Sequence, residues 1–282
     1  MINYRNLIDH GTLILKKSSI PTAQLDAEIL LSLSLNESRE RILLDLEKKI
    51  NLYQLNHYIY LINRRKKLEP ISLISGKKFF WKQDFIVNQN VLTPRYETEL
   101  LVEETLKICG HSNHINVLDI GVGSGCILIS LFDEKKNWRG TGIDISKQAL
   151  KIAKTNAKIQ QVQNRIKFIK SDIDKFKDKK YDLIVTNPPY ISKIEYNNLN
   201  LGVKDYEPIT ALYGGINGFE TIEKIIKRCK VLLKIGGLLA MEIGINQHKK
   251  VSELLKLYGF YVKKTIKDYQ KIKRCIFAIK IK

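Results

Sequence analysis

The 282-residue chain has few cysteines and prolines and no long apolar run. Its cysteines are Cys109, Cys126, Cys229 and Cys275. No two of them lie within three residues of each other, so their spacing suits neither a zinc site nor a CxxC redox pair. His111 and His114 have no third ligand near them in the sequence, and we expect no metal. Because no stretch approaches about 18 uncharged apolar residues, we also expect no membrane span.

Acidic residues are scarce as well. The chain has 48 Lys and Arg against 29 Asp and Glu, which gives a net charge of +19. Such charge favours a nucleic-acid partner, but the lysines are spread along the chain without Arg-rich or aromatic-interleaved runs. Drift of the composition towards Lys, Ile and Asn is an equally good explanation. The N-terminus lacks a charged head followed by an apolar run, so we expect no secretory signal. The sequence therefore predicts a soluble cytoplasmic protein. We also expect a monomer without stable nucleic-acid binding.

The first seventy or so residues have apolar side chains at helical spacing. Thr22 is the candidate N-cap of a helix over 25–35, and we expect two further helices over 42–50 and 52–67. The basic cluster that ends the last helix suits a helix C-terminus and needs no nucleic acid to explain it. Residues 1–70 are therefore predicted to form a small helical bundle. Such bundles more often recognise a partner than carry out catalysis.

The sequence changes character after Pro70. Residues 71–95 carry short β-rich pieces between polar residues, which predicts a β-hairpin linker. From 96 to 282 a helix leads into alternating strands and helices, which predicts an α/β fold with a doubly wound, mostly parallel seven-stranded sheet. The last two strands are too close for a crossover helix, so we expect an antiparallel hairpin at one edge. The expected strands are Asn116–Ile120, Gly140–Asp144, Ile166–Ser171, Asp182–Thr186, Leu238–Ile243, Tyr261–Lys267 and Cys275–Ile281.

The first of these strands ends in a glycine-rich turn and is followed by an apolar helix. The turn consists of Gly121, Val122, Gly123, Ser124 and Gly125. A strand, a glycine turn and a helix in this order are typical of nucleotide binding. Glycines permit positive φ and let backbone N–H groups approach a ligand closely. The next residue is Cys126, where a dinucleotide-binding turn would have a third spaced glycine, so a different nucleotide-like cofactor is favoured.

Acids stand at the tips of the next two strands. Asp144, about twenty residues past the turn, can accept hydrogen bonds from both hydroxyls of a ribose. It can also cap the helix that begins near Ser146. Asp172, at the tip of the third strand, can accept the exocyclic amine of adenine, and a loop or cap role fits it nearly as well.

The fourth strand is followed by Asn187, Pro188, Pro189 and Tyr190. Two consecutive prolines fix φ and remove two donors, which places the Asn187 side chain and the Pro188 carbonyl rigidly. Two acceptors that face one pocket can hold both hydrogens of an –NH₂ group, and Tyr190 offers a ring face for a planar amide or base. Held in this way, a poorly nucleophilic amide nitrogen is directed at a methyl donor, and charge that develops on it is stabilised.

Taken together, these motifs resemble the class I methyltransferase fold, in particular its amino-methylating members with an Asn-Pro-Pro-aromatic motif. DNA adenine, ribosomal-RNA guanine and protein glutamine methyltransferases share that motif. The helical segment over 25–31, the linker 69–76, the run from Val91 to Arg95 and the later segments 206–218 and 239–247 are similar to bacterial protein glutamine methyltransferases.

One branch of that group methylates release factors and another a ribosomal protein. Tyr96-Glu97-Thr98-Glu99 is similar to the PETE of the release-factor branch, with Tyr96 in place of proline. Ile173 is a second departure, because relatives often carry an aromatic there. The chain thus resembles the bacterial peptide chain release factor N5-glutamine methyltransferases (PrmC/HemK family) over essentially its whole length.

The resemblance implies a reaction and a set of site residues. S-adenosylmethionine would be the cofactor and S-adenosylhomocysteine the product, with methyl transfer to the glutamine amide N5 of the Gly-Gly-Gln motif in class I release factors. The expected cofactor-binding residues are Gly121, Val122, Gly123, Ser124, Gly125, Asp144, Asp172 and Asn187. The expected substrate-binding residues are Asn187, Pro188, Pro189 and Tyr190, of which Asn187, Pro188 and Tyr190 are also the catalytic candidates. Methylation of a ribosomal-protein glutamine or of a nucleic-acid amine are the alternatives.

Overall fold

The computed structural model describes residues 2–282, which divide into two compact units. The helical unit comprises the described residues up to Gly76 and the segment Asn200–Tyr206, and the sheet unit comprises Lys77–Leu199 and Glu207–Lys282. Residue 1, where the expected helical domain 1–70 starts, lies outside the described residues. The helical unit therefore reaches six residues past the expected boundary and also takes in a segment from the second half of the chain.

The helical unit is built around three longer helices. Its helices are α1 (Tyr4–Lys17), α2 (Ala23–Leu35), α3 (Arg39–Leu44), α4 (Leu52–Lys66), α5 (Ile71–Ser75) and α10 (Leu201–Lys204). Buried leucine, isoleucine and tyrosine side chains from α1, α2 and α4 form its core. A largely buried ion pair joins α4 to α2, with 2.7 Å between Arg65 Nε and Asp26 Oδ2. The segment Asn200–Tyr206 is tied in by the Tyr206 hydroxyl, which donates to the Lys67 carbonyl at 2.9 Å.

Two details of the expected helices differ from the structure. The helix expected to continue to Ile50 was too long, because α3 ends at Leu44. The carbonyls of Leu46 and Lys48 instead accept backbone N–H groups from the first turn of α1. Thr22 occupies the N-cap position of α2, but its side chain makes no capping hydrogen bond in the described structure.

The expected hairpin linker over 71–95 begins with the short helix α5. The hairpin itself consists of β1 (Lys77–Phe80) and β2 (Gln83–Ile86), which pair antiparallel. Phe80 and Phe85 are buried and meet edge to face, with 6.0 Å between ring centroids. Their side chains belong to the core of the sheet unit.

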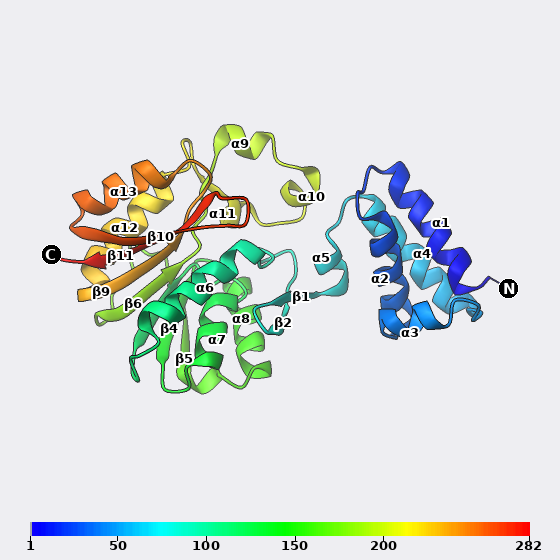
Figure 1. Ribbon diagram of the computed structural model, residues 1–282, viewed down its shortest axis with the longest axis horizontal. Helices are drawn as coiled ribbons and strands as arrows, with labels where there is room; N and C mark the ends of the chain where they lie inside the picture. The colour runs from blue at the N-terminus through cyan, green and yellow to red at the C-terminus, as the bar shows by residue number, and fades with distance from the viewer. Residues whose placement is uncertain (1) are drawn as a thin grey trace. The chain divides into compact units, whose positions relative to one another are not determined.

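The sheet unit contains a seven-stranded sheet, in agreement with the predicted fold class (Figure 1). Its strands are β3 (Asn116–Ile120), β4 (Arg139–Asp144), β5 (Ile166–Lys170), β6 (Tyr181–Thr186), β9 (Leu233–Glu242), β10 (Phe260–Lys267) and β11 (Lys273–Lys280). The strand order is β10-β11-β9-β6-β3-β4-β5; β11 pairs antiparallel with β10 and with β9, and the other neighbouring strands pair parallel. The chain runs from β3 outward to β5 and returns to β6 on the other side of β3. Ligands of such sheets bind at this reversal, beyond the carboxyl ends of the strands.

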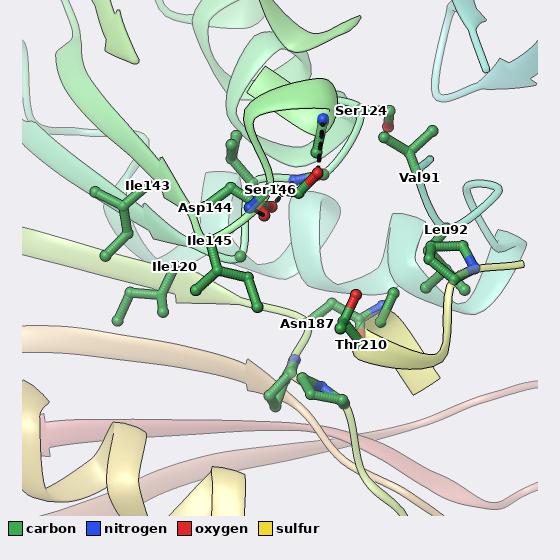
Figure 2. Close-up of a pocket in the computed structure, with 18 of the residues that line it drawn as sticks. Val91, Leu92, Ile120, Ser124, Ile143, Asp144, Ile145, Ser146, Asn187 and Thr210 are labelled. Atoms are coloured by element: carbon green, nitrogen blue, oxygen red, sulfur yellow. Dashed lines mark hydrogen bonds between the residues drawn. The ribbon is translucent and has the colours of Figure 1, made fainter. Parts of the chain in front are cut away.

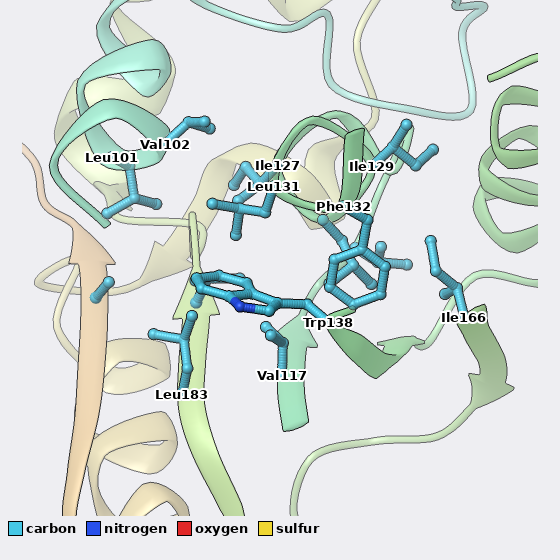
Figure 3. Close-up of a cluster of buried hydrophobic side chains, with 14 of the residues drawn as sticks. Leu101, Val102, Val117, Ile127, Ile129, Leu131, Phe132, Trp138, Ile166 and Leu183 are labelled. Atoms are coloured by element: carbon cyan, nitrogen blue, oxygen red, sulfur yellow. The ribbon is translucent and has the colours of Figure 1, made fainter. Parts of the chain in front are cut away.

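Helices cover both faces of this sheet. The remaining elements are α6 (Tyr96–Cys109), α7 (Cys126–Glu134), α8 (Lys147–Ile159), the 3₁₀ turn Gln163–Arg165, β7 (Ile191–Ser192), α9 (Lys193–Asn197), α11 (Ile209–Leu212), β8 (Tyr213–Gly215), α12 (Glu220–Leu232) and α13 (His248–Leu257). Alternate strand residues point to opposite faces: Val117 packs with α6, α7 and α8, and Leu118 packs with α12 and α13. Trp138 is buried in the first of these layers beside Phe132 and Leu183 (Figure 3). The central strands β3 and β6 are buried on both faces and are apolar nearly throughout, which made them recognisable in the sequence, whereas the outer strands β5 and β10 carry exposed lysines.

No helix in residues 2–282 is both long and apolar enough to cross a membrane. No group of three or more His, Cys, Asp or Glu side chains in the same range is placed to hold a metal ion.

Candidate active site

A cavity of about 480 Å³ lies at the carboxyl ends of the parallel strands of the sheet unit (Figure 2). The ends of β3, β4, β5 and β6 contribute to its wall, together with residues 90–98, residues 208–213 and α12. Figure 2 shows Asp144 and Ser146 on one side and Asn187 with Thr210 on another. The expected site residues that line it are Gly121, Val122, Gly123, Ser124, Asp144, Asp172, Asn187, Pro188 and Pro189. The fold thus brings together residues from four separate strand ends.

The turn after β3 depends on glycine. Gly121, Gly123 and Gly125 have φ values of +74°, +53° and +84°, which residues with a side chain rarely adopt. A Cβ added to Gly121 would meet no atom within 4 Å, so the space beside the turn is open on that side. Gly125 differs, because an added Cβ would lie 2.7 Å from Ile129 Cδ1, and Gly125 does not line the cavity. It starts α7 instead of facing a ligand.

Asp144 is held by backbone donors on both sides. Its Oδ2 accepts from the Gly123 N–H at 3.0 Å and its Oδ1 from the Ser146 N–H at 2.8 Å. Burial raises the pKa of this carboxyl, and these N–H groups oppose the rise. The carboxylate lines the cavity, and each of its oxygens has a lone pair that is not used. It can therefore accept further hydrogen bonds from hydroxyl groups of a ligand.

Asp172 lies at the edge of the cavity and is partly exposed to solvent. Its side chain is 42% exposed and lies 3.2 Å from the ammonium of Lys224, which also contacts Asp174 at 2.8 Å. The Asp174 N–H and then Lys224 hold the pKa of Asp172 below its ordinary value. Asp172, Ile173 and Lys224 all line the cavity, so this end of it is a partly apolar slot with a charged rim.

The Asn187 side chain belongs to a hydrogen-bonded chain of three residues. Asn187 Nδ2 donates to Thr98 Oγ1 at 3.1 Å, and the Thr98 hydroxyl donates to Glu242 Oε2 at 2.6 Å. Thr98 is on α6 and Glu242 ends β9, so three distant parts of the sequence meet here. Since the Asn187 amide nitrogen is occupied by Thr98, its Oδ1 is the atom left for the cavity.

We expected the Tyr190 ring to face a substrate, but the structure places it elsewhere. It does not line the cavity. Its partly buried ring packs with the α12 and α13 layer, and its hydroxyl donates to Glu242 Oε1 at 3.2 Å. Burial raises the pKa of this phenol, and the charge of Glu242 raises it further. The Tyr190 carbonyl accepts from Gln247 Nε2 at 2.9 Å, which holds the backbone after the two prolines.

An ion pair closes another part of the wall. Arg95, just before α6, lies 2.5 Å from Glu207 through Nη2 and Oε2. The Glu207 side chain is only 1% exposed, and burial raises the pKa of its carboxyl against the opposing charge of Arg95. The pair fastens the segment before α6 to the segment that leads into α11. Both residues lie in segments that resemble the glutamine methyltransferases, but the pairing was not predicted.

Sequence reasoning missed Asp119, which precedes the glycine turn within β3. It is 1% exposed, and neither carboxylate oxygen has a hydrogen-bond partner in the described structure. Burial raises the pKa of Asp119 to about 8, and the nearby charge of Asp144 adds to the rise. A lone acid inside an apolar strand was the available signal, since an unpaired buried acid is costly and points to function. Glu242 carries the same signal in β9.

A comparison with protein families identifies both units. A model of the PrmC N-terminal domain matches residues 6–76, and a model described as a methyltransferase domain matches residues 111–278. A release factor glutamine methyltransferase of Fusobacterium nucleatum is 39% identical over 269 residues, covering 94% of this chain and 76% of the relative. Its counterpart in Clostridium acetobutylicum is 36% identical and covers 95% of each chain.

Longer relatives exist as well. A bifunctional methyltransferase of Rickettsia typhi is 34% identical over 291 residues, and the chain spans just over half of its length (56%). Among solved structures, a ribosomal protein L11 methylase from Lactobacillus delbrueckii has a TM-score of 0.52 at 17% identity, with 68% of this chain and 82% of that one covered. A methyltransferase from Pyrococcus furiosus has the same score and identity, with 71% and 89% covered. At this identity the structures show that the sheet unit has the methyltransferase fold.

Proposed function

This chain belongs to the release factor glutamine methyltransferases, and we propose that it carries out the reaction for which that family is named. It transfers the methyl group of S-adenosylmethionine to the side-chain amide N5 of the glutamine in the Gly-Gly-Gln motif of class I release factors. The observation that carries the proposal is the orientation of Asn187, whose amide nitrogen is held by Thr98 so that Oδ1 remains for the cavity. An acceptor in this place suits a substrate with an –NH₂ group.

The cavity wall fits S-adenosylmethionine. The open space beside Gly121 and the positive φ values of the turn leave room for a ligand against the backbone. Asp144 has free lone pairs for ribose hydroxyls, and Asp172 and Ile173 border a slot for adenine. Asp119 precedes the turn but does not line the cavity; its buried unpaired carboxylate would be stabilised by a positive charge brought near it by a ligand. The bound cofactor supplies an electrophilic methyl group on a sulfonium sulfur.

Asn187 and Pro188 prepare the acceptor amide. Asn187 Oδ1 and the Pro188 carbonyl accept one hydrogen each from the glutamine –NH₂ and turn its nitrogen towards the methyl group. They also stabilise the positive charge that develops on nitrogen as the new N–C bond forms and the C–S bond breaks. One of the two hydrogens then leaves the nitrogen as a proton. Pro189 keeps the backbone after Pro188 rigid, and Tyr190 acts from behind the wall, through Glu242.

The helical unit docks the protein substrate in this proposal. Its match to the PrmC N-terminal domain supports the assignment. Because release factors act on ribosomes, we place the enzyme in the cytoplasm. We expect it to act as a monomer without a metal and without stable nucleic-acid binding.

Labelled S-adenosylmethionine and purified enzyme test the proposal against four acceptors: a release factor, the same factor with its Gly-Gly-Gln glutamine changed to alanine, ribosomal proteins, and total nucleic acid. We expect label in the unchanged release factor alone. Mass spectrometry of the tryptic peptide then places the added methyl group on the glutamine. Label that enters only ribosomal protein, RNA or DNA would contradict the proposed substrate.

A further inference from the structure

Glu242 binds two residues of the candidate site at once. Its Oε2 accepts from the Thr98 hydroxyl at 2.6 Å, and its Oε1 accepts from the Tyr190 hydroxyl at 3.2 Å. The Glu242 residue is 1% exposed and does not line the cavity. One buried carboxylate therefore holds the tyrosine of the Asn-Pro-Pro-Tyr segment directly and its asparagine through Thr98.

The single hydrogen of the Thr98 hydroxyl determines which way the Asn187 amide faces. A threonine hydroxyl has one hydrogen to donate, and the Thr98 hydrogen goes to Glu242. Thr98 Oγ1 can then only accept from Asn187, so the Asn187 group beside it must be the Nδ2 donor. An amide turned by 180° would set Oδ1 against a hydroxyl that has no hydrogen left. The carboxylate thus selects one of two amide orientations that otherwise occupy the same space.

We propose that Thr98 and Glu242 are positioning residues that fix the Asn187 amide with Oδ1 towards the acceptor –NH₂. This inference rests on the proposed function, because it assigns the two residues a role in glutamine methylation. Glu242 does not line the cavity, and the hydroxyl of Thr98, which does line it, is engaged by Asn187 and Glu242. The two residues determine whether Asn187 presents an acceptor or a donor to the substrate, and a donor there would repel an –NH₂ group.

The network requires an ionised Glu242. A protonated carboxyl has a hydrogen of its own, so one of the two bonds it accepts must reverse. The groups that act on Glu242 are the Thr98 and Tyr190 hydroxyls, the cation of Arg274 on β11 and the anion of Glu97 on α6. Burial raises the pKa of Glu242, against the two hydroxyls and Arg274. If the hydrogen of the protonated carboxyl is donated to Thr98, methyl transfer decreases as pH falls through this raised pKa; if it is donated to Tyr190, the Thr98 bond and the orientation of Asn187 are kept.

Thr98→Val tests the proposal, since it removes the hydroxyl with almost no change of shape. We expect kcat for release-factor methylation to decrease roughly tenfold to a hundredfold, as for a misplaced catalytic group. The affinity for S-adenosylmethionine should stay within about twofold. Thr98→Ser retains the hydroxyl and should recover most of the activity. Thr105→Val is the matched control: it makes the same change on the same helix, at a buried hydroxyl that has no hydrogen-bond partner in the described structure.

The pH profile separates positioning from a structural defect. An acidic limb of the wild-type kcat that arises from Glu242 should be absent from Thr98→Val, because protonation of Glu242 no longer reaches Asn187 in that variant. Cofactor binding measured over the same pH range controls for unfolding. Glu242→Leu, which can accept from neither hydroxyl, provides a second variant if Thr98→Val does not fold. It should also lose activity and any acidic limb that arises from Glu242.

The experiments distinguish a failure of the proposed function from a failure of the positioning role of Thr98 and Glu242. A wild-type enzyme that labels no release factor would contradict the proposed function and this inference with it. An active wild-type enzyme whose kcat is matched within about threefold by a folded Thr98→Val or Glu242→Leu variant would overturn the inference alone.

Discussion

The backbone N–H of Gly123 donates to Oδ2 of Asp144 across 3.0 Å, so the turn after β3 and the acid at the tip of β4 form one hydrogen-bonded unit. Bound S-adenosylmethionine would contact both Gly123 and Asp144, since both residues line the cavity. Loss of the carboxylate should consequently affect the ligand contacts and also the support of the turn.

Asp144→Ala should weaken the binding of S-adenosylmethionine by about one to two decades. Charge-assisted hydrogen bonds to ribose hydroxyls contribute roughly 1.5–3 kcal/mol each, and every 1.4 kcal/mol is about a factor of ten. Titration calorimetry measures the change, with Asp84→Ala as the control because Asp84 is exposed and does not line the cavity. An unchanged dissociation constant in a folded Asp144→Ala variant would refute the ribose role.

Asn187→Ala should lower turnover on the order of 10²–10³-fold, because one preorganised polar contact to the reacting group is lost. The affinity for S-adenosylmethionine should change by less than about threefold. Labelled methyl transfer and calorimetry on the same preparations measure the two quantities. Asn198→Ala, at an exposed asparagine, is the control. A decrease of turnover below about threefold would mean that the asparagine does not orient the amide.

Asn156→Ala should lower the free energy of unfolding by about 2–4 kcal/mol. The buried Asn156 amide accepts from the Ile86 N–H at 2.8 Å and donates to the carbonyls of Ile86 and Ser124 at 3.0 and 2.9 Å. Alanine would leave these backbone groups without partners, and each unsatisfied buried group costs about 1–3 kcal/mol. Urea denaturation compares this variant with Asn113→Ala, whose side chain is exposed. Equal midpoints would show that the ties to Ile86 and Ser124 are dispensable.

Asp119 should make the cofactor-free protein less stable as pH rises. The folded pKa of about 8 lies above the ordinary value near 4, so the folded state holds the proton more tightly. The resulting stabilisation is complete below about pH 4 and is lost as pH rises through the folded pKa. Between pH 5 and 8.5 the wild type should lose at least about 1.4 kcal/mol, equivalent to one pKa unit, relative to Asp119→Asn.

Urea denaturation at several pH values measures this difference. Asp9→Asn, at an exposed position on α1, is the control and should follow the wild type. Parallel pH dependence of wild type and Asp119→Asn would show that the Asp119 carboxyl titrates as an ordinary acid in the folded protein.

The sheet could be predicted because its signals are local. The apolar runs that end in Ile120 and Thr186 are bounded by the glycine turn and by two prolines, and the structure has strands there. The closeness of the last two strands predicted the edge hairpin, which β10 and β11 form. The residues that gather at the cavity were predicted for a topological reason, since parallel strands bring their carboxyl ends to one edge.

Contacts between distant segments could not be predicted in this way. Thr98 carries no sign that its hydroxyl lies between Asn187 and Glu242, 89 and 144 residues away. The orientation of Tyr190 was missed for the same cause, because its partner Glu242 decides where the ring points. The length of α3 was overestimated because the first turn of α1 binds carbonyls that a longer helix would have used.

Because Asn200–Tyr206 belongs to the helical unit, this unit is completed late during translation. A ribosome releases the first 76 residues early, but the segment that completes this unit emerges more than a hundred residues later. The Tyr206 hydroxyl reaches the Lys67 carbonyl only then. Translation thus delivers the larger part of the bundle well before its final piece. A protease that cuts once near Gly76 would likewise leave one part of the helical unit on the other fragment, so a single cleavage does not yield two whole units.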